Sequence, residues 1–592
     1  MPQEEANKWI VMLTMGIMIT LLVKDKVRPS LVFIAAIVIL IVSKVIPVTI
    51  LVESLANKQI LTIFLIIILS AVIQQNFNIQ KVLDRFLAGS KNGRVFMLKM
   101  NIVVASMSSI FNNTPIVILF VPYVYSWAKR VGVEPSRLLM PLSFSAILGG
   151  MITIVGTSTN LVLNGLLEAQ KESLLTFGDF FYLGLLVSFV GVIYLYFFGY
   201  NMLNGKATLE EEIKEHYREY FVEVKISPNS LYKGKSLKDS SLQKLKGICL
   251  IEVIRADKVF NVVENSSLEL QRGDRLIFTG NMPEIIELLK GNQDLELAKN
   301  SKFDFADQMN IVEASLPSNS ILEGVKIKDS DFRNKYRSVI IAVHRNGEQL
   351  SGRIGEITLR RGDLLLLASS DNASNYLLKK DFYLLSTKES FELKSKWSNN
   401  FFLTGLVLSI GFLLLGTIDL FSTLLILTAL ALFLNMVSLQ KLKSEIDLDL
   451  LAILVASLAI GDAFISSGAS GFLASNFLDF ILPYGLIPVL IGLVLFTLLI
   501  TSFITNVAAI SVVFPLAYSI SQTLGIEGKP LYLAVAFAAS AAFLTPIGYQ
   551  TNLIVAGPGG YGFRDFFKVG APLTFLYLAC SLLFIIFKYQ LI

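Results

Sequence analysis

Two short polar segments interrupt long apolar stretches of this sequence and carry side chains that could do chemistry. They are Asn112-Asn113-Thr114 and, much later in the chain, Thr505-Asn506-Val507. Pro115 follows the first segment and disfavours a helix running back through it. A turn in each segment would expose helix-end amides and carbonyls beside the side-chain amides and hydroxyls. Amide N–H groups and hydroxyls suit an anion, whereas carbonyls and Asn or Ser oxygens suit a hard monovalent cation.

Glycines interrupt a second pair of apolar stretches. Gly149-Gly150 and Gly156 break the first, and Pro546 and Gly548 break the other. Irregular backbone at membrane depth persists only where it is buried in protein or lines a wet cavity. Interrupted helices at corresponding positions of two halves are typical of the central site of a transporter. The alternative is that these residues only pack helices together, but their recurrence at matching positions favours a site.

The polar segments belong to a sequence that is repeated. Residues 112–114 match residues 505–507 at a separation of 393, and Pro122 matches Pro515 at the same separation. Residues 153–161 (TIVGTSTNL) match residues 545–553 (TPIGYQTNL) at a separation of 392. Because the separation is almost constant across both motifs, we interpret the two parts as copies of one unit.

The composition restricts the class of protein. The 592 residues are 54% hydrophobic and only 16% charged, with a mean hydropathy of +0.63, which is typical of a membrane protein. A net charge of +5 gives no sign of nucleic acid as a partner. Cys249 and Cys580 cannot form a disulfide framework or a zinc site, and both histidines lie in the polar middle of the chain. No nucleophile–base pair or metal cluster is evident, so we do not expect an enzyme.

Charge divides the chain into three parts. Residues 1–203 and 399–592 are apolar, and residues 204–398 are polar. We therefore predict an all-α polytopic membrane protein with a soluble α+β insert. The first apolar run lacks a small-residue cleavage signature and leads directly into a second, so we expect a retained helix. The predicted helices lie near 9–23, 29–47, 59–76, 95–128 (a folded-back pair), 137–167 (interrupted), 178–200, 400–416, 418–439, 449–467, 486–521 (a pair), 531–556 (interrupted) and 568–588.

The distribution of Lys and Arg predicts the orientation. If each folded-back pair re-enters the membrane without crossing it, each half crosses five times and the second copy is inverted. With the N-terminus outside, the loops that collect most Lys and Arg then face the cytoplasm, as the positive-inside rule requires. Among them are Lys24, Arg28, Arg94 and Lys129. The same orientation places residues 204–398 in the cytoplasm and the protein in the cell membrane.

The polar insert is itself doubled. Ser230-Leu231-Tyr232-Lys233-Gly234 recurs as Ser320-Ile321-Leu322-Glu323-Gly324, and Arg272-Gly273-Asp274 recurs as Arg361-Gly362-Asp363, in both cases before an apolar run. Short β-rich runs between turn signals predict two small modules, residues 204–300 and 301–398. Their layout resembles a tandem pair of TrkA C-terminal (RCK-C) regulatory modules, which would bind a small regulatory ligand. The alternative is a pair of folded spacers without a ligand.

These motifs resemble the divalent anion:sodium symporter family of the ion transporter superfamily, over about two-thirds of the chain. The family's Ser-Asn-Thr hairpin signature is matched by Asn112-Asn113-Thr114 and partly by Thr505-Asn506-Val507. Its Gly-Thr-x-x-Asn pattern is matched by residues 156–160, while residues 548–552 carry Tyr549 in place of the Thr. The stretch around Gly557-Pro558-Gly559-Gly560 resembles the sequences of the family branch that carries RCK-C modules. In that branch sulfate is the commoner substrate.

The resemblance implies the site residues. Sodium ions would be bound by Ser108, Asn112, Asn113 and Gly156 in the first half, and by Thr501, Ile504, Asn506 and Gly548 in the second. The anion would contact Asn113, Thr114, Thr157 and Asn506. Supporting roles would fall to Thr505, Asn160 and Asn552.

From these features we expect a sodium-coupled importer of a small dianion that works by alternating access as a homodimer in the bilayer. Val507 removes one hydroxyl donor, which fits sulfate better than a dicarboxylate. No Lys or Arg lies on a tip, so bound sodium and helix dipoles must balance the dianion. The alternatives are a di- or tricarboxylate symporter, a ligand-gated ion channel, and a receptor that uses the transport fold only to sense.

Overall fold

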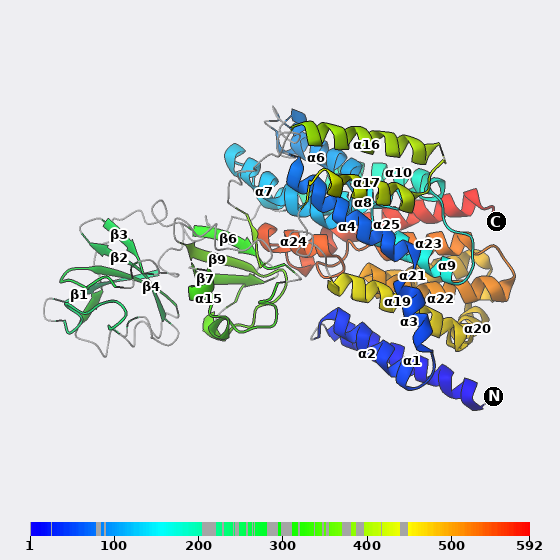
Figure 1. Cartoon of the computed structure of the whole chain (residues 1–592), viewed down its shortest axis with the longest axis horizontal. Coiled ribbons are helices and arrows are strands. Elements are labelled where there is room, and N and C mark those ends of the chain that lie inside the picture. Colours follow the sequence, from blue (N-terminus) through cyan, green and yellow to red (C-terminus); the bar gives the residue numbers. More distant parts are fainter. Residues whose placement is uncertain are drawn as a thin grey trace.

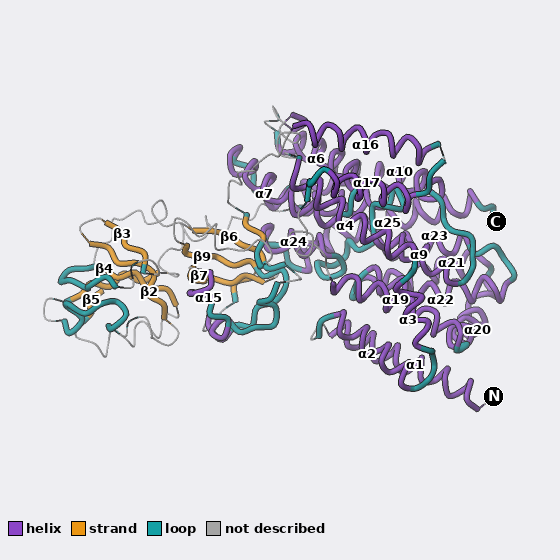
Figure 2. Tube along the Cα trace, viewed as in Figure 1, coloured by secondary structure: helices purple, strands orange, loops and turns teal. Residues whose placement is uncertain are grey.

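The computed structural model is mostly helical, with two small β-sheets from the middle of the chain (Figures 1 and 2). The predicted domain limits at 204, 300 and 301 lie outside the described residues, and the limit at 398 lies within a helix. The structure describes residues 2–591 except for 25–26, 78–84, 88–89, 91, 204–220, 228–229, 241, 243–247, 256–257, 263–264, 266, 281–293, 298–310, 318–319, 337, 346–347, 351–353, 370–380, 386–395, 416 and 438–447.

The first apolar part forms helices at the predicted places. The helix expected near 59–76 is preceded by a short one at an angle of 41°, and the interrupted helix near 137–167 is two separate helices. The helices are α1 (Pro2–Lys24), α2 (Pro29–Val42), α3 (Val48–Leu55), α4 (Lys58–Asn76), α6 (Gly93–Ser108), α7 (Asn113–Val131), α8 (Leu139–Gly150), α9 (Ser158–Ala169), α10 (Phe177–Tyr194) and α11 (Tyr200–Met202).

The second apolar part follows the same order and adds one helix that the sequence did not predict, α20. It has only 13 residues, so it is too short for a spanning segment. It buries Ala469, Ala474 and Leu478 and packs on α22. The helices are α16 (Lys396–Leu414), α17 (Leu420–Phe433), α19 (Leu448–Ser466), α20 (Ala469–Ile481), α21 (Leu486–Thr501), α22 (Asn506–Leu524), α23 (Lys529–Ser540), α24 (Gln550–Gly559) and α25 (Phe563–Lys588).

Burial separates central helices from peripheral ones. Every residue of α8 is buried, and in α23 every residue except Lys529 is buried. In contrast, large apolar side chains are exposed on the outer helices, for example Phe433 (84%) and Phe575 (73%). Five of the described helices are long and apolar enough to cross a membrane, or six if α3 and α4 count as one bent span. The exposed apolar side chains and these helices indicate a multi-pass membrane protein.

The two helical parts pack on each other reciprocally. Helix α2 packs on α19 of the other part, and the corresponding α17 packs on α4. Likewise α9 packs on α22, while α24 packs on α7, and α10 lies against its own counterpart α25. Reciprocal pairs of this kind arise when a two-fold axis relates two similar units. The inversion of one unit relative to the other stays a prediction.

The insert contains two antiparallel five-stranded sheets with the same strand order, β3-β2-β4-β1-β5 and β8-β7-β9-β6-β10. Both have a bulge at the same place, between Leu250 and Glu252 in β2 and between Ile340 and Ala342 in β7. The strands are β1 (Phe221–Ile226), β2 (Ile248–Arg255), β3 (Lys258–Asn261), β4 (Arg275–Gly280), β5 (Leu295–Leu297), β6 (Ile311–Ser315), β7 (Ser338–Arg345), β8 (Glu348–Gln349), β9 (Leu364–Ser369) and β10 (Tyr383–Leu384), with a short helix α15 (Phe332–Tyr336).

The second sheet lies between the helical part and the first sheet (Figure 1). One face of it packs its own small core, and the other face joins the core of the helical part through residues such as Leu364 and Leu366. Strand β6 contacts α24. The insert is therefore in direct contact with the second interrupted helix.

Candidate functional site

The two predicted hairpin tips are breaks between paired helices. Helix α6 ends at Ser108 and α7 begins at Asn113, while α21 ends at Thr501 and α22 begins at Asn506. Thr505 caps α22, because its side chain accepts a hydrogen bond from the Ala508 amide (3.4 Å). Each tip thus presents the unpaired amides of a helix N-terminus.

In each half, a hydroxyl at the end of the first helix of the pair forms a hydrogen bond with the helix that follows the pair. The Ser108 hydroxyl donates to the carbonyl of Ala146 in α8 (2.8 Å). The Thr501 hydroxyl donates to the carbonyl of Ala539 in α23 (2.6 Å). The two acceptors are 393 residues apart, as are the two donors, so the contact follows the sequence repeat.

The breaks in the two interrupted helices also correspond. Thr153 lies in the first break and donates to the Ser109 carbonyl, and Thr545 in the second donates to the Ser502 carbonyl (2.8 Å). The buried supporting amides close each break: Asn160 donates to the carbonyl of Thr153 (3.0 Å) and Asn552 to that of Thr545 (3.1 Å). Two of the three predicted supporting residues, Asn160 and Asn552, therefore hold the loops from which α9 and α24 begin.

The tip amides lie among oxygen atoms. The inner end of the Asn113 amide is 3.1 Å from the Gly156 carbonyl and 3.0 Å from the Ala146 carbonyl, and it also contacts the Ser108 hydroxyl. With its nitrogen inward, this amide donates hydrogen bonds to those carbonyls. With its oxygen inward, the four groups form a cluster of oxygens. The nitrogen-inward orientation satisfies the amide through these hydrogen bonds, whereas the oxygen-inward orientation needs a donor or a bound cation to satisfy the amide oxygen.

The second half repeats this cluster. The inner end of the Asn506 amide is 3.2 Å from the carbonyls of both Gly548 and Ala539 and 3.1 Å from the Thr501 hydroxyl. Six of the eight predicted sodium ligands thus gather in two clusters, one in each half. The other two, Asn112 and Ile504, lie on the wall of a cavity described below.

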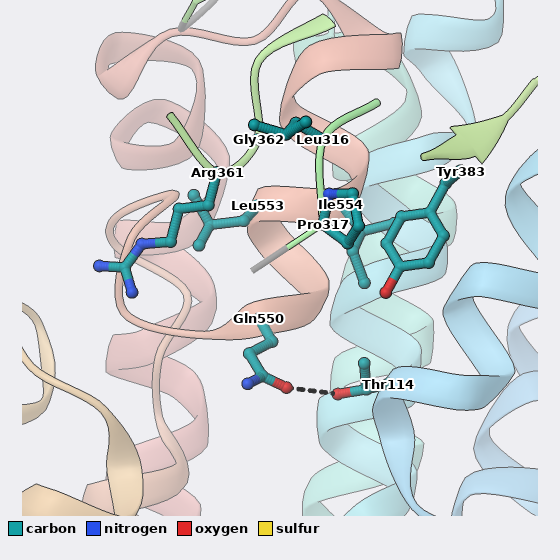
Figure 3. Close-up of a pocket in the computed structure, with 9 residues that line it drawn as sticks. All are labelled: Thr114, Leu316, Pro317, Arg361, Gly362, Tyr383, Gln550, Leu553 and Ile554. Carbon is teal, nitrogen blue, oxygen red and sulfur yellow. Dashed lines mark hydrogen bonds between the residues drawn. The ribbon is translucent and has the colours of Figure 1, made fainter. Parts of the chain in front are cut away.

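The first tip meets the second interrupted helix directly. The amide of Asn113 contacts the Tyr549 hydroxyl (2.7 Å), and the Thr114 hydroxyl donates to the side-chain carbonyl of Gln550 (3.1 Å; Figure 3). Thr157 lies 3.4 Å from the same Tyr549 hydroxyl. Three of the four predicted anion-binding residues therefore surround Tyr549 and Gln550, at the N-terminus of α24. The sequence motifs give neither Tyr549 nor Gln550 a role, although Tyr549 departs from the family pattern.

A cavity of about 140 Å³ lies where the tips meet. The first turns of four helices contribute to its wall: Thr114 from α7, Ser158 from α9, Asn506 from α22 and Gln550 from α24. Because a helix N-terminus carries partial positive charge and free amides, these four termini bring positive potential to the cavity wall without a charged side chain on any tip. The predicted residues Asn113 and Thr157 are buried behind this wall.

Charged side chains lie elsewhere on the cavity wall, and sequence reasoning missed them. Arg28 and Asp449 come from the helical part, while Glu323 and Arg361 come from turns beside the second sheet of the insert. The sequence places the last two far from any membrane segment, so no local pattern could have assigned them to the site. Only the docking of the insert on α24 brings them there.

Comparison with known proteins indicates a transporter. The model of the family described as "Citrate transporter" (CitMHS) matches residues 19–420 and 410–591. The chain is 31% identical to "Uncharacterized transporter sll0640" of Synechocystis, over 89% of this chain and 88% of the relative. It is 30% identical to the "Putative sulfur deprivation response regulator" of Chlamydomonas reinhardtii, over 88% of this chain and 92% of the relative.

A more distant relative, "Sodium/sulfate cotransporter 1" of Chlamydomonas reinhardtii, is 24% identical over 52% of this chain and 37% of its own length. The family match extends over both helical parts, and the two more similar relatives align along most of their length. The chain therefore belongs to the citrate transporter family, CitMHS, and to the ion transporter superfamily.

Proposed function

We propose that this protein is a sodium-coupled symporter that imports a divalent anion, with sulfate as the first candidate, by an alternating-access mechanism. The observation that carries the proposal is the convergence of four helix N-termini on one cavity at the meeting point of the two halves. Amides and hydroxyls on such termini stabilise an anion without a fixed positive charge. An anion held in this way can leave again, as a transport cycle requires.

The oxygen clusters support sodium as the coupling ion. In each half, the inner atom of the tip amide lies within about 3.2 Å of two backbone carbonyls and one hydroxyl, and a bound cation would turn the amide oxygen towards them. Uncharged oxygens of this kind suit a hard monovalent cation. Because the clusters lie behind the helix N-termini that face the cavity, bound sodium would add the positive charge that a dianion needs. Anion and sodium would then bind cooperatively.

The wider assignment rests on the sequence motifs together with the reciprocal helix packing. We place the chain in the divalent anion:sodium symporter branch with tandem RCK-C modules, built from two inverted five-crossing repeats with re-entrant hairpins. Residues 204–398 would face the cytoplasm of the cell and bind a small regulatory ligand. A homodimer through the scaffold helices is expected from the resemblance alone.

Two observations favour rival substrates or roles. The family is described as a citrate transporter family, which favours a di- or tricarboxylate. The name of one relative, a sulfur deprivation response regulator, favours a receptor that senses sulfate without accumulating it. A ligand-gated ion channel is the third possibility.

Uptake of labelled sulfate into proteoliposomes tests the proposal. An inward sodium gradient should drive accumulation above the equilibrium level, and an equal potassium gradient should not. Asn113→Ala should abolish the sodium effect. The control is Asn476→Ala, at an exposed position of α20, which should behave as the wild type. Unlabelled citrate and succinate added in excess should compete weakly.

Strong competition by citrate would assign a tricarboxylate instead of sulfate. Equilibration without accumulation would indicate a channel, and binding without uptake would indicate a receptor. Sodium-independent accumulation that survives Asn113→Ala would refute the proposed site.

A further inference from the structure

One turn of the insert, Arg360–Asp363, lies directly on α24. In this turn Gly362 has a positive φ of 80°, and the space where its side chain would be is bounded by Leu553 of α24. On the helix side, a Cβ atom on Gly557 would be only 3.0 Å from the Gly362 carbonyl and 3.2 Å from the Cβ of Leu364. Because neither Gly362 nor Gly557 has a side chain, the backbone of the insert can contact the backbone of α24 directly.

The turn is held rigidly within the insert. Asp363 accepts hydrogen bonds from Nε and Nη2 of Arg345 (2.7 and 2.8 Å) and from the backbone amide of Arg360 (2.8 Å). Arg345 also donates to the Thr358 carbonyl (2.9 Å). The Arg345–Asp363 pair fixes the backbone of the turn that contains Arg361. The position of Arg361 relative to α24 is therefore defined.

The first sheet contains the same turn in a different setting. Asp274 accepts from Arg255 (2.8 and 2.7 Å) and from the backbone amide of Gln271 (2.8 Å), as Asp363 does from its own partners. Arg272, which corresponds to Arg361, is exposed, and the nearest atom to a Cβ on Gly273 is the Lys225 side chain at 3.9 Å. Arg272 and Arg361 therefore occupy equivalent positions in the two modules, but only Arg361 lies beside α24.

Arg361 is half-buried and lies on the wall of the central cavity with Gln550 and Thr114. Figure 3 shows its side chain extending past Leu553 on the side of the α24 N-terminus. Glu323 and Asp449 on the same wall offset part of its charge. A guanidinium presents a planar set of donors that matches two oxygens of an oxyanion or carboxylate. Such a group is absent from the tips themselves.

We propose that Arg361 of the cytoplasmic insert is an anion-recognition residue of the transport site, contacting the dianion at the insert-facing mouth of the cavity. The inference rests on the proposed function, because it assumes an anionic substrate in this cavity. The insert then completes the site, and its position on α24 sets the affinity for the anion on that side of the membrane. Displacing the insert from α24 would lower this affinity.

The test compares Arg361→Gln and Arg361→Lys with the matched control Arg272→Gln. Binding of sulfate and of citrate to the purified full-length protein in sodium is measured by titration calorimetry, and uptake is measured in proteoliposomes. For the anion that the wild type binds, Arg361→Gln should raise the Kd about ten-fold, as expected for loss of one charge-assisted contact. Arg361→Lys should restore part of the affinity, and Arg272→Gln should leave it unchanged.

A wild-type Kd in Arg361→Gln, or an equal loss in Arg272→Gln, would overturn the assignment. Thermal unfolding of each variant separates loss of binding from loss of fold. As a second route, Gly557→Val should push the turn away from α24 and raise the same Kd in a protein that retains Arg361. The proposed function is tested independently of Arg361: sodium-independent uptake, or a wild type without uptake, would refute it whatever the Arg361 variants show.

Discussion

The two corresponding glycines of the interrupted helices differ in the space around them, and this difference predicts unequal effects of substitution. A Cβ atom on Gly156 would lie 2.5 Å from the Ser108 carbonyl oxygen and 2.6 Å from the Gly150 carbonyl oxygen. A Cβ atom on Gly548 would lie 3.0 Å from the Thr501 carbonyl oxygen and 3.2 Å from the Thr545 hydroxyl. Gly156→Ala should therefore damage the site far more than Gly548→Ala.

The magnitude follows from what must move. Both close neighbours of Gly156 are backbone atoms, which cannot rotate away, so the loop that carries the Gly156 carbonyl must shift away from Asn113. Overpacking of a tight site costs about 1–3 kcal/mol, and each 1.4 kcal/mol corresponds to about ten-fold in affinity. We expect Gly156→Ala to lower the apparent sodium affinity by about ten- to a hundred-fold. At Gly548 a shift of a few tenths of an ångström suffices, and we expect less than about five-fold.

Sodium activation of sulfate uptake measures this difference. Both variants and the wild type are reconstituted at equal density, and size-exclusion and thermal-unfolding profiles confirm that each is folded. A normal sodium activation curve for Gly156→Ala would refute the predicted role of its carbonyl. Equal losses in both variants would refute the reasoning from the space around each glycine.

Three further predictions concern single side chains. Tyr549→Phe leaves the buried amide of Asn113 without the hydroxyl at 2.7 Å, so sulfate uptake should fall about ten-fold; unchanged uptake would remove Tyr549 from the site. Burial raises the pKa of Glu252 to about 7, so the first sheet should lose stability as pH rises from about 4.5 to 7. Hydrogen exchange of the β2 amides measures this loss, and Glu252→Gln should abolish it. Burial lowers the pKa of His344 to about 4, so the second sheet should lose stability as pH falls from about 6.5 to 4, the opposite trend; parallel trends in both sheets would contradict these assignments.

The positions of the membrane helices could be predicted because hydropathy and the polar breaks mark them directly. The tips, for example, begin α7 at Asn113 and α22 at Asn506, inside the predicted folded-back pairs. Helix α20 was missed because its 13 residues are too few to span a membrane and it buries only one face. The repeat could be predicted because residues that make equivalent hydrogen bonds, such as Asn160 and Asn552, recur at matching positions.

The composition of the cavity wall was harder to predict. Family motifs indicate Asn113 and Thr157, which the structure buries behind the wall, whereas Gln550 and Arg361 reach the cavity through contacts between segments far apart in the chain. Contacts of this kind depend on tertiary packing and leave no local pattern. Tyr549 was recognised only as a departure from a motif, and its contacts with Asn113 and Thr157 required the structure.

The central claim is that sodium and the dianion are held together where the two tips meet, and titration calorimetry of sulfate in sodium and in potassium tests it most directly. Because binding of one ligand must then favour the other, the Kd for sulfate should be about ten-fold or more lower in sodium than in potassium at equal ionic strength. Both Asn113→Ala and Asn506→Ala should reduce that difference. An equal Kd in the two salts, with sulfate bound in both, would contradict the account.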